Sequence, residues 1–307
     1  MANSLLKVLG YYSIKKTIKQ KLFYKRLQVE DARKKRQTLR LIKNLPDNTI
    51  KQNKNTGNVV VSLTSYGLRI TDTLPYTLYS LLIQTQLPDR ILVWLEEELY
   101  NKDNLPEILK QFESKGVEFL FVKNIKSYKK LIPTLCLCPD SIIITVDDDW
   151  YYNENTVKWL VSDYLESDKR TVFGTWGFLP LVKDGKYLPY NQWNDKDCDV
   201  DKEVSLIGCG GILYPPNIFD DEILKVDLFM KFAPAADDLW FWVMEKRAGV
   251  KVRLSTTHGY GLHQAVNRID VWKPKESNSL YKVNVLNGKN DEQFLKLISY
   301  YGISPQE

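Results

Sequence analysis

The feature that most constrains this chain is an apolar run that ends in three adjacent aspartates. Residues 141–146 read Ser-Ile-Ile-Ile-Thr-Val, and Asp147, Asp148 and Asp149 follow directly. A short β-branched run of this kind indicates a buried strand. Three neighbouring carboxylates repel one another unless positive charge lies between them. Because Mg²⁺ and Mn²⁺ prefer carboxylate oxygens and share their shell with phosphates, the pattern predicts a site for a divalent cation and a phosphate-bearing ligand.

The same aspartates have an ordinary alternative interpretation. Aspartate is common in turns and at helix N-caps, and a helical pattern follows from Asn153. One aspartate here would indicate only a turn or a cap. Three in succession, directly after an apolar strand, favour the metal–phosphate interpretation.

From residue 58 onward, short apolar runs alternate with helical patterns. The expected strands are 59–64, 90–95, 117–122, 141–146, 171–178 and 251–255, and the expected helices are 71–85, 104–115, 128–137, 153–165, 236–248 and 289–301. Segments 179–201 and 256–279 show no clear period. Such alternation predicts an α/β fold with a mostly parallel central sheet and flanking helices. Ligands of such sheets bind beyond the carboxyl ends of the strands, where the aspartates stand.

The net charge of +5 is unevenly distributed. Residues 1–54 contain 15 Lys or Arg against three acidic residues, whereas the remainder contains 28 basic and 35 acidic residues. We therefore expect two parts, a basic helical arm with its linker over residues 1–56 and a catalytic domain over residues 57–307. The polar stretch 44–57, with a proline and a glycine, is the expected linker.

The arm reads as a basic amphipathic helix, which favours an anionic membrane surface as its partner. Packing on the main domain or on another subunit is the alternative, and no nucleic-acid partner is expected because no aromatic-rich nucleic-acid pattern accompanies the charge. No apolar run approaches the ~18 residues of a membrane span, and we expect no secretory signal. Four cysteines and two histidines match no zinc pattern. The expected location is the cytoplasm, peripheral at the inner face of the plasma membrane.

Four segments together resemble bacterial family 2-like glycosyltransferases of the GT-A fold. They are residues 60–66 (Val-Val-Ser-Leu-Thr-Ser-Tyr), 142–149, 208–216 (Gly-Cys-Gly-Gly-Ile-Leu-Tyr-Pro-Pro) and 237–240 (Asp-Asp-Leu-Trp). The resemblance covers roughly residues 58–300 and leaves the arm uncovered. It implies a nucleotide-sugar donor, a Mn²⁺ or Mg²⁺ cofactor and an acceptor alcohol.

The resemblance also assigns roles to the acidic residues. The family's metal-binding DxD pattern maps onto residues 147–149, with Asp147 and Asp149 expected on the metal side, because side chains at i and i+2 of an extended stretch share a face. Asp148 would then face the donor ribose or sugar. The family's acidic pair maps onto Asp237 and Asp238. Asp238 is the preferred base for the acceptor hydroxyl, although helix capping alone also explains an Asp pair.

Further residues are expected to bind the donor. Thr64 and Tyr66 follow the first strand and are suited to holding the nucleoside, and Arg69 suits bidentate contact with phosphate. Lys129 is the preferred lysine of the pair before the metal strand. For Thr64, Tyr66 and Arg69 the alternative is an ordinary strand–helix turn. For Lys129 the alternative is the start of a helix with exposed lysines.

Three glycines and one histidine complete the expected site. Gly208, Gly210 and Gly211 allow a ligand to approach the backbone closely, or else form a tight bend, and Gly210 and Gly211 are the first choices for contact with the donor. His263 is the candidate third metal ligand, ahead of His258. Trp193 is a candidate acceptor contact.

The sequence therefore predicts a metal-dependent glycosyltransferase. It would move a sugar from a nucleotide-diphosphate donor, with a UDP-sugar as first choice, to a surface-polysaccharide or lipid-linked glycan acceptor. One base favours inversion of the anomeric carbon, while retention stays open. The alternatives are a nucleotidyltransferase and a non-catalytic nucleotide- or glycan-binding scaffold.

Overall fold

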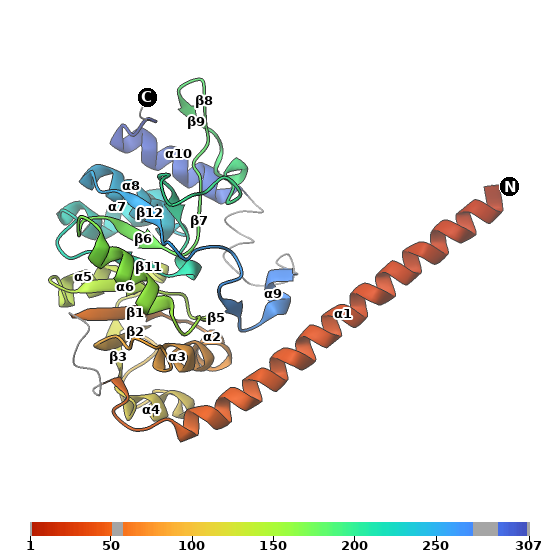
Figure 1. The fold of residues 1–307 in the computed structure, drawn as a ribbon, viewed down its shortest axis with the longest axis horizontal. Coiled ribbons are helices and arrows are strands. Elements are labelled where there is room, and N and C mark those ends of the chain that lie inside the picture. The colour runs from red at the N-terminus through yellow and green to blue at the C-terminus, as the bar shows by residue number, and fades with distance from the viewer. Residues whose placement is uncertain (1, 51–57, 273–287, 306–307) are drawn as a thin grey trace.

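The computed structural model describes residues 2–50, 58–272 and 288–305, with the side chains of the first helix described from residue 18 onward. Its centre is a seven-stranded sheet with the strand order β12-β6-β11-β4-β1-β2-β3 (Figure 1). The strands are β1 (Val59–Thr64), β2 (Arg90–Glu96), β3 (Val117–Val122), β4 (Ile142–Thr145), β6 (Val172–Gly174), β11 (Ile212–Tyr214) and β12 (Val252–Leu254).

Only β11 runs against its neighbours in this sheet. It pairs antiparallel with β4 and β6, whereas the other neighbouring strands pair in parallel. The mostly parallel α/β sheet expected from the sequence is confirmed. The antiparallel direction of β11 has a consequence for the site, because the start of β11 lies at the edge where β4 and β6 end.

The strand sequences explain why the sheet is buried on both faces. Successive side chains of a strand point to opposite faces. In β1, Val59, Val61 and Leu63 belong to one apolar cluster, and Val60 belongs to another. In β4, Ile144 faces the first cluster and Ile143 the opposite one. Continuous β-branched runs are typical of such doubly covered strands.

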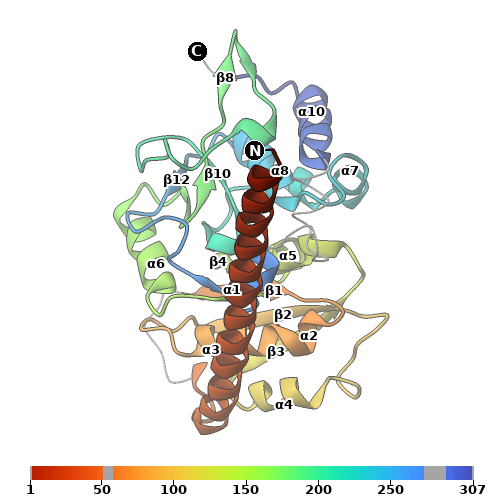
Figure 2. The ribbon, with the colours of Figure 1, turned by 90° about the vertical axis from the view of Figure 1, so that its right-hand side faces the viewer.

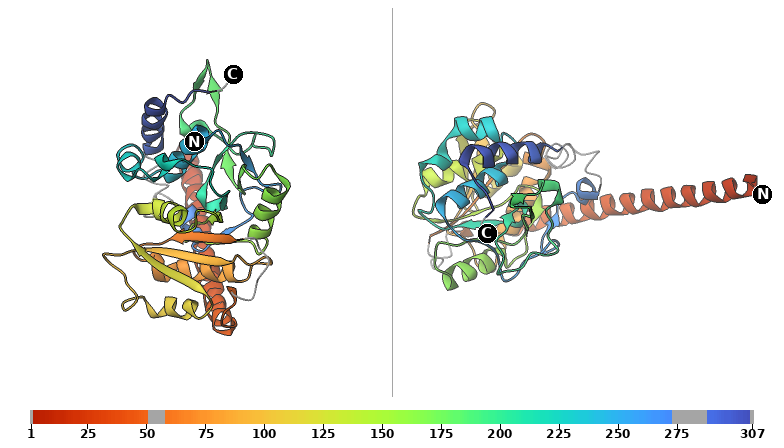
Figure 3. Two further views of the ribbon diagram at one scale, coloured as in Figure 1. Left: turned by 90° about the vertical axis from the view of Figure 1, so that its left-hand side faces the viewer. Right: turned by 90° about the horizontal axis from the view of Figure 1, so that it is seen from above.

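Helices cover both faces (Figures 1 and 3). The first apolar cluster lies under α3 (Leu74–Leu82), α4 (Glu107–Glu113) and α6 (Thr156–Glu166). The opposite cluster is formed with residues of α7 (Val226–Phe232), α8 (Asp237–Ala248) and α10 (Lys289–Tyr301), next to α5 (Ile132–Leu137). Shorter helical segments are α2 (Arg69–Asp72), α9 (Arg268–Trp272) and the 3₁₀ segments η2 (Lys126–Lys130), η3 (Tyr190–Gln192), η4 (Gly208–Gly210) and η5 (Asp221–Leu224).

The second half of the chain is less regular than the first. Three small antiparallel pairs form there: β5 (Trp150–Tyr151) with β13 (Gln264–Ala265), β7 (Gly177–Phe178) with β10 (Ser205–Leu206), and β8 (Val182–Lys183) with β9 (Lys186–Tyr187). The single strand expected over 171–178 is thus two strands in two sheets. Segment 256–279, expected to be irregular, contains β13 and α9, and its residues from 273 lie outside the described part.

Helix α8 is buried around its whole circumference. Residues 239–244 are all at most 2% exposed, including Trp240 and Trp242. The helix ends where Gly249 takes up a left-handed conformation (φ +62°), which glycine adopts without steric cost. Because residues 239–244 are buried on every side, the position of α8 is set by the elements packed around this stretch.

Helix α1 (Ala2–Asn44) is 43 residues long, and its N-terminal end projects away from the rest of the molecule (Figures 1, 2 and 3). Its C-terminal part packs on the domain through buried Leu27 and Ile42. Buried Asp31 accepts hydrogen bonds from the backbone N–H and the Nε of Arg268, at 2.9 and 2.6 Å. The basic arm is thus one helix whose two ends differ in their surroundings.

The packed part of α1 contacts α2 and β5, two elements that adjoin the candidate site. Lys35 Nζ lies 2.6 Å from Asp72 Oδ1, at the end of α2. Thr38 Oγ1 lies 3.3 Å from the hydroxyl of Tyr151 in β5, and Lys34 Nζ lies 3.9 Å from the centre of the same ring. The arm therefore touches the segments directly after Arg69 and directly after the aspartate run.

The end of the arm packs on the main apolar cluster, to which Ile42 and Ile50 belong. The division at residues 56 and 57 stays a prediction. Residues 51–57 of the expected linker lie outside the described part. Of the helices in the described part, none is both long enough and apolar enough to cross a bilayer.

Glu245 predicts a pH dependence of stability. It is 2% exposed in α8, and its pKa is raised to about 8 because burial disfavours the charged form, with Lys246 only partly opposing this. An unfolded glutamate ionises near pH ~4.3, so the native state loses stability as pH rises from there to about 8. We expect Glu245→Gln to match the wild type at pH 5 and to be more stable at pH 8, by on the order of 2 kcal/mol. Urea unfolding at both pH values measures this.

The matched control is Glu166→Gln, at the exposed end of α6. It should shift both midpoints by little. Equal pH slopes for wild type and Glu245→Gln would show that the buried carboxyl does not cause the effect.

Candidate active site

Several chain segments meet at one edge of the central sheet. The parallel strands β1, β4, β6 and β12 all end there, and the antiparallel strand β11 begins there. The segments after β1 and β4 carry Arg69 and the aspartate run, and the η4 glycines precede β11. The topology thus brings segments that are distant in sequence to the position where α/β sheets bind ligands.

Arg69 binds two of the three adjacent aspartates. Its Nη1 donates to Asp148 Oδ1 at 2.7 Å, and its Nη2 lies 2.8 Å from Asp149 Oδ2. The second oxygen of Asp148 accepts a hydrogen bond from the hydroxyl of Ser65. Burial lowers the pKa of Arg69, but the Asp149 and Asp148 carboxylates outweigh burial and raise it. The guanidinium is therefore a permanent positive charge between the end of β1 and the aspartate run.

Lys130 is the second cation of the site, and three carboxylates surround it. Its Nζ lies 2.9 Å from Asp237 Oδ2, 3.0 Å from Asp147 Oδ1 and 3.7 Å from Asp238 Oδ1. The side chain is 5% exposed. Burial lowers its pKa, but these three negative charges raise it well above the usual value. The lysine thus joins η2, the segment after β4 and the start of α8.

Gly208 leaves the space that Lys130 fills. A Cβ at this position would lie 2.4 Å from Lys130 Nζ and 3.1 Å from Asp238 Oδ1. Its backbone N–H donates to Asp238 Oδ2 at 3.2 Å. The glycine therefore serves close approach of side chains to the backbone, and alanine would displace the lysine from its carboxylates.

The two aspartates at the start of α8 differ in their surroundings. Asp237 is buried and accepts a hydrogen bond from Ser127 Oγ at 2.8 Å. Asp238 is 27% exposed at its side chain, and among the described residues its Oδ1 has no hydrogen-bond donor. Burial raises the pKa of Asp238 to about 7, against the opposing charge of Lys130. Asp238 is thus the more exposed member of the pair, and its Oδ1 lies 3.7 Å from Lys130 Nζ, beyond hydrogen-bond distance.

Negative charge is in excess in this cluster. The carboxylates outnumber the cations by three, counting Asp147, Asp148, Asp149, Asp237 and Asp238 against Arg69 and Lys130. Within the described ranges, no three His, Cys, Asp or Glu side chains are grouped so that they could hold a metal ion by themselves. A cation site here would therefore take the rest of its ligands from a bound molecule.

The three adjacent aspartates are unequally accessible. The side chains of Asp147 and Asp149 are 34% and 28% exposed, whereas that of Asp148 is 4% exposed. The strand ends before them, so they lie in a turn. Asp148 and Asp149 both form ion pairs with Arg69, whereas Asp147 forms an ion pair with Lys130. The strict alternation used to place Asp147 and Asp149 on one face does not hold in a turn, although these two are the accessible ones.

His263 lies close to the cluster but is occupied by the protein. Its Nδ1 accepts the backbone N–H of Asn153 at 3.2 Å, so its Nε2 carries the proton and donates to the Gly210 carbonyl at 3.0 Å. Burial lowers the pKa of His263 to about 4, so the ring is neutral. With both ring nitrogens engaged, we leave His263 out of the proposed metal shell. It holds the glycine segment in place.

The residues expected to bind the donor are only partly gathered. Tyr66 is 46% exposed and its ring centre lies 5.5 Å from the Arg69 guanidinium, at the site. The Thr64 hydroxyl donates to the Trp94 carbonyl inside the sheet. Lys129 is buried beside Asn124, and burial lowers its pKa against the charges of Glu96 and Glu98. Thr64 and Lys129 therefore point away from the aspartates.

The glycines of residues 208–211 face two different surroundings. A Cβ on Gly211 would face Thr156 and Leu160 of α6, on the side of the core. Its φ of +84° is the reason for a glycine there. Gly210 borders the site, since its carbonyl accepts the His263 hydrogen bond. Of the three glycines named from the sequence, Gly208 is the one in contact with the acidic cluster.

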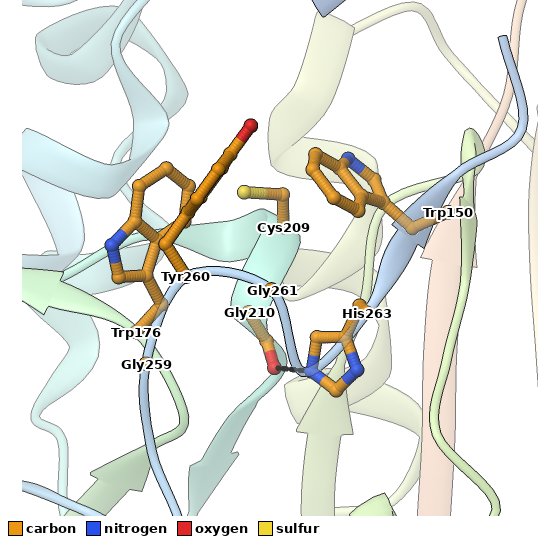
Figure 4. A pocket seen from close by; sticks show the side chains of 8 residues that line it. All are labelled: Trp150, Trp176, Cys209, Gly210, Gly259, Tyr260, Gly261 and His263. Atoms are coloured by element: carbon orange, nitrogen blue, oxygen red, sulfur yellow. Dashed lines mark hydrogen bonds between the residues drawn. The ribbon is translucent and has the colours of Figure 1, made fainter. Parts of the chain in front are cut away.

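A shallow hollow, partly open to solvent, lies beside the cluster (Figure 4). Cys209, next to Gly208, lies between the rings of Tyr260 and Trp150, with Trp176 behind Tyr260. Burial raises the pKa of the Cys209 thiol, and the charges of Asp147, Asp149 and Asp238 raise it further. The expected acceptor contact Trp193 is instead 6% exposed in an aromatic core with Trp242 and Phe294.

The chain matches no protein-family model and no curated protein. Its structure is similar to that of glucosyl-3-phosphoglycerate synthase from Mycobacterium tuberculosis in complex with Mg²⁺ and uridine diphosphate, with 12% identity, 85% of this chain and 83% of that chain covered, and a TM-score of 0.48. It is also similar to the inositol-1-phosphate CTP transferase from T. maritima, with 12% identity, 80% and 98% covered, and a TM-score of 0.41. Likeness at this level says nothing of what this protein binds or catalyses.

Lys130 predicts a difference between two neighbouring lysines. Lys130→Met leaves three carboxylates without their cation, so we expect the free energy of unfolding at pH 7.5 to fall by about 3 kcal/mol. Lys129→Met removes an equally buried lysine that does not face the cluster, and it should cost much less. Urea unfolding of both variants compares them.

The gap between these variants should narrow at pH 5. The raised pKa of Asp238, about 7, means that this carboxyl is protonated there and needs less compensation. Equal stability of the two variants at pH 7.5 would contradict the role assigned to Lys130.

Proposed function

We propose that this protein is a divalent-cation-dependent glycosyltransferase. The observation that carries the proposal is the excess of carboxylates over cations at the ligand-binding edge of the sheet, with Asp147 and Asp149 accessible. The donor is a sugar nucleoside diphosphate, with the UDP class as first choice, and the acceptor is a hydroxyl of a surface-polysaccharide or lipid-linked glycan. The motif resemblance of residues 60–66, 142–149, 208–216 and 237–240 supports the same reaction class.

The donor set fits Mg²⁺ or Mn²⁺. Such ions are commonly held by one or two carboxylates together with substrate phosphates, which matches two accessible aspartates and an incomplete protein shell. When bound, the ion supplies Lewis-acid stabilisation of the charge that develops on the departing diphosphate. Asp147 and Asp149 are its proposed protein ligands.

Arg69 and Lys130 are the cations that would contact the donor diphosphate, beside the metal ion that Asp147 and Asp149 would hold. Both pair with these carboxylates in the structure. A guanidinium forms paired hydrogen bonds with phosphate oxygens, and an ammonium acts as a point charge. Arg69 therefore serves as the diphosphate contact, with Tyr66 beside it for the nucleoside. Asp148 stays bound to Ser65 and positions Arg69.

Asp238 is the proposed base. Its Oδ1 lacks a hydrogen-bond donor among the described residues, and its Oδ2 is held by the Gly208 N–H. It accepts the proton of the acceptor hydroxyl, the hydroxyl oxygen bonds to the anomeric carbon, and the electron pair of the broken bond leaves with the diphosphate. One base on one face corresponds to inversion. Asp237, fixed by Ser127 and Lys130, positions Asp238 and the lysine.

A screen tests the reaction class. Purified protein is incubated with a panel of nucleotide sugars and Mn²⁺, and release of nucleoside diphosphate is measured with and without chelator. We expect release with at least one donor, and its loss with chelator. Asp238→Asn should lower transfer about 100-fold or more while leaving donor binding intact.

The matched control is Asp227→Asn, which changes an exposed aspartate in the first turn of α7. It should keep full activity. Cation-independent release, or an Asp238→Asn variant as active as the control, would contradict the proposal.

The arm is proposed to lie on an anionic membrane surface. Ile18, Leu22 and Val29 of α1 are each more than half exposed, and exposed lysines flank them at residues 19, 21 and 25. An apolar stripe bordered by lysines suits an interface with anionic lipid. This would place a cytoplasmic enzyme at the inner face of the plasma membrane, near lipid-linked acceptors.

Vesicle flotation tests the arm. The full chain should bind phosphatidylglycerol-containing vesicles more tightly than neutral ones, and less at high salt. Changing Ile18→Asp and Leu22→Asp together should lower binding about 10-fold or more, while Leu295→Asp, an exposed leucine on α10, should not. Equal binding by the two variants would exclude the stripe as the contact.

A further inference from the structure

An aromatic pair stands at the border of the candidate site. Trp176 and Tyr260 have ring centres 5.0 Å apart, inclined at 51°. Tyr260 is 58% exposed, although large aromatic side chains usually bury most of their surface. It lies between Gly259 and Gly261, both with positive φ, so the backbone turns sharply on either side of the ring. An exposed ring held in this way offers a face to a ligand.

Trp176 is fixed from behind. Its ring packs edge-on against Phe178 at 5.7 Å, and Phe178 packs in the same manner on Tyr190. Its Nε1 donates to Asp195 Oδ2 at 3.4 Å. A ring anchored by packing and by a hydrogen bond loses little freedom when a ligand stacks on it.

Two shallow hollows, both partly open to solvent, adjoin this pair. The first holds Cys209 between Tyr260 and Trp150 (Figure 4). The second is lined by Trp176 and Tyr260 together with Asp195 and His258. Because the aromatic pair lines both, the hollows adjoin each other along one open path past the rings.

The first hollow lies next to the proposed chemistry. Cys209 follows Gly208, whose N–H holds the base Asp238. Trp150, which lines the same hollow, directly follows Asp149 in the chain. A molecule in this hollow therefore lies next to the segments that carry the proposed base and a proposed cation ligand, whereas the second hollow is lined by neither Cys209 nor Trp150.

The chemistry of the walls selects the occupant. The faces of the rings suit the C–H faces of a sugar, while Asp195 and His258 offer hydrogen-bonding groups at the second hollow. A lipid chain there would cover the Asp195 carboxylate without giving it a partner, which costs free energy. Apolar walls with a few polar groups are typical of sites that recognise ligands of mixed character.

We infer that this path, here named the aromatic groove and defined by Trp150, Trp176, Asp195, His258 and Tyr260, binds an acceptor of at least two linked sugar rings, one on each side of the Trp176–Tyr260 pair. The inference rests on the proposed function and adds where the glycan acceptor binds and that at least two of its sugar rings are recognised. Trp176 and Tyr260 act as specificity-determining residues through stacking.

A glycan array containing mono- to hexasaccharides tests the groove. The full chain is applied with UDP and Mn²⁺. We expect binding to at least one oligosaccharide, at least 10-fold tighter than to its terminal monosaccharide. Tyr260→Ala and Trp176→Ala should each lower this binding about 10-fold, whereas Tyr260→Phe, which keeps the ring, should retain it. Tyr300→Ala, at a half-exposed tyrosine on α10, is the control.

UDP binding with Mn²⁺, measured by calorimetry, separates this inference from the proposed function. The alanine variants should bind UDP as the wild type does. Wild-type protein that binds UDP, but binds no oligosaccharide better than a monosaccharide, overturns the groove alone. Alanine variants that keep full glycan binding also overturn it. Glycan binding through the groove without any UDP binding would support the groove and contradict the proposed function.

Discussion

The arrangement of this protein depends on two cations that hold five carboxylates together at one edge of a sheet. Lys130 is shared by acidic groups from two segments, and Arg69 binds two neighbouring aspartates that are distant from it in sequence, so the ion pairs also join elements of the fold. Repulsion among the acids is strong where water is partly excluded. The cluster therefore holds segments of the fold together and, at the same time, carries more acidic groups than cations. A metal cation that brings a phosphate-bearing ligand would compensate this excess of negative charge.

Much of the fold could be predicted because the signals are local. The strands are β-branched runs, and their alternation with helical patterns fixes the fold class before any contact is known. The short helix α7 was missed, and the strand expected over 171–178 divides between two sheets. Both lie in the second half, where the aromatic and polar residues carry no clear period and packing between distant segments decides the local structure.

The residue types of the site could be predicted from the sequence, but the directions in which the side chains point were harder to predict. An aspartate run after an apolar strand indicates a functional site. Whether Lys129 or Lys130 faces the aspartates depends on the 3₁₀ geometry of η2. The same holds for Gly208, whose importance arises from a lysine 78 positions earlier in the chain. His263 was a reasonable ligand by type, but the N–H of Asn153 claims one of its nitrogens. Such partners come from the tertiary fold, and no spacing rule contains them.

The packing of α1 has a geometric consequence. The helix is anchored on Asp72, three residues after Arg69, and on Tyr151, two residues after Asp149. The long rod and the reaction centre are thus linked through very short stretches of chain. A surface or molecule that fixes the orientation of the first turns of α1 therefore also fixes the orientation of the candidate active site.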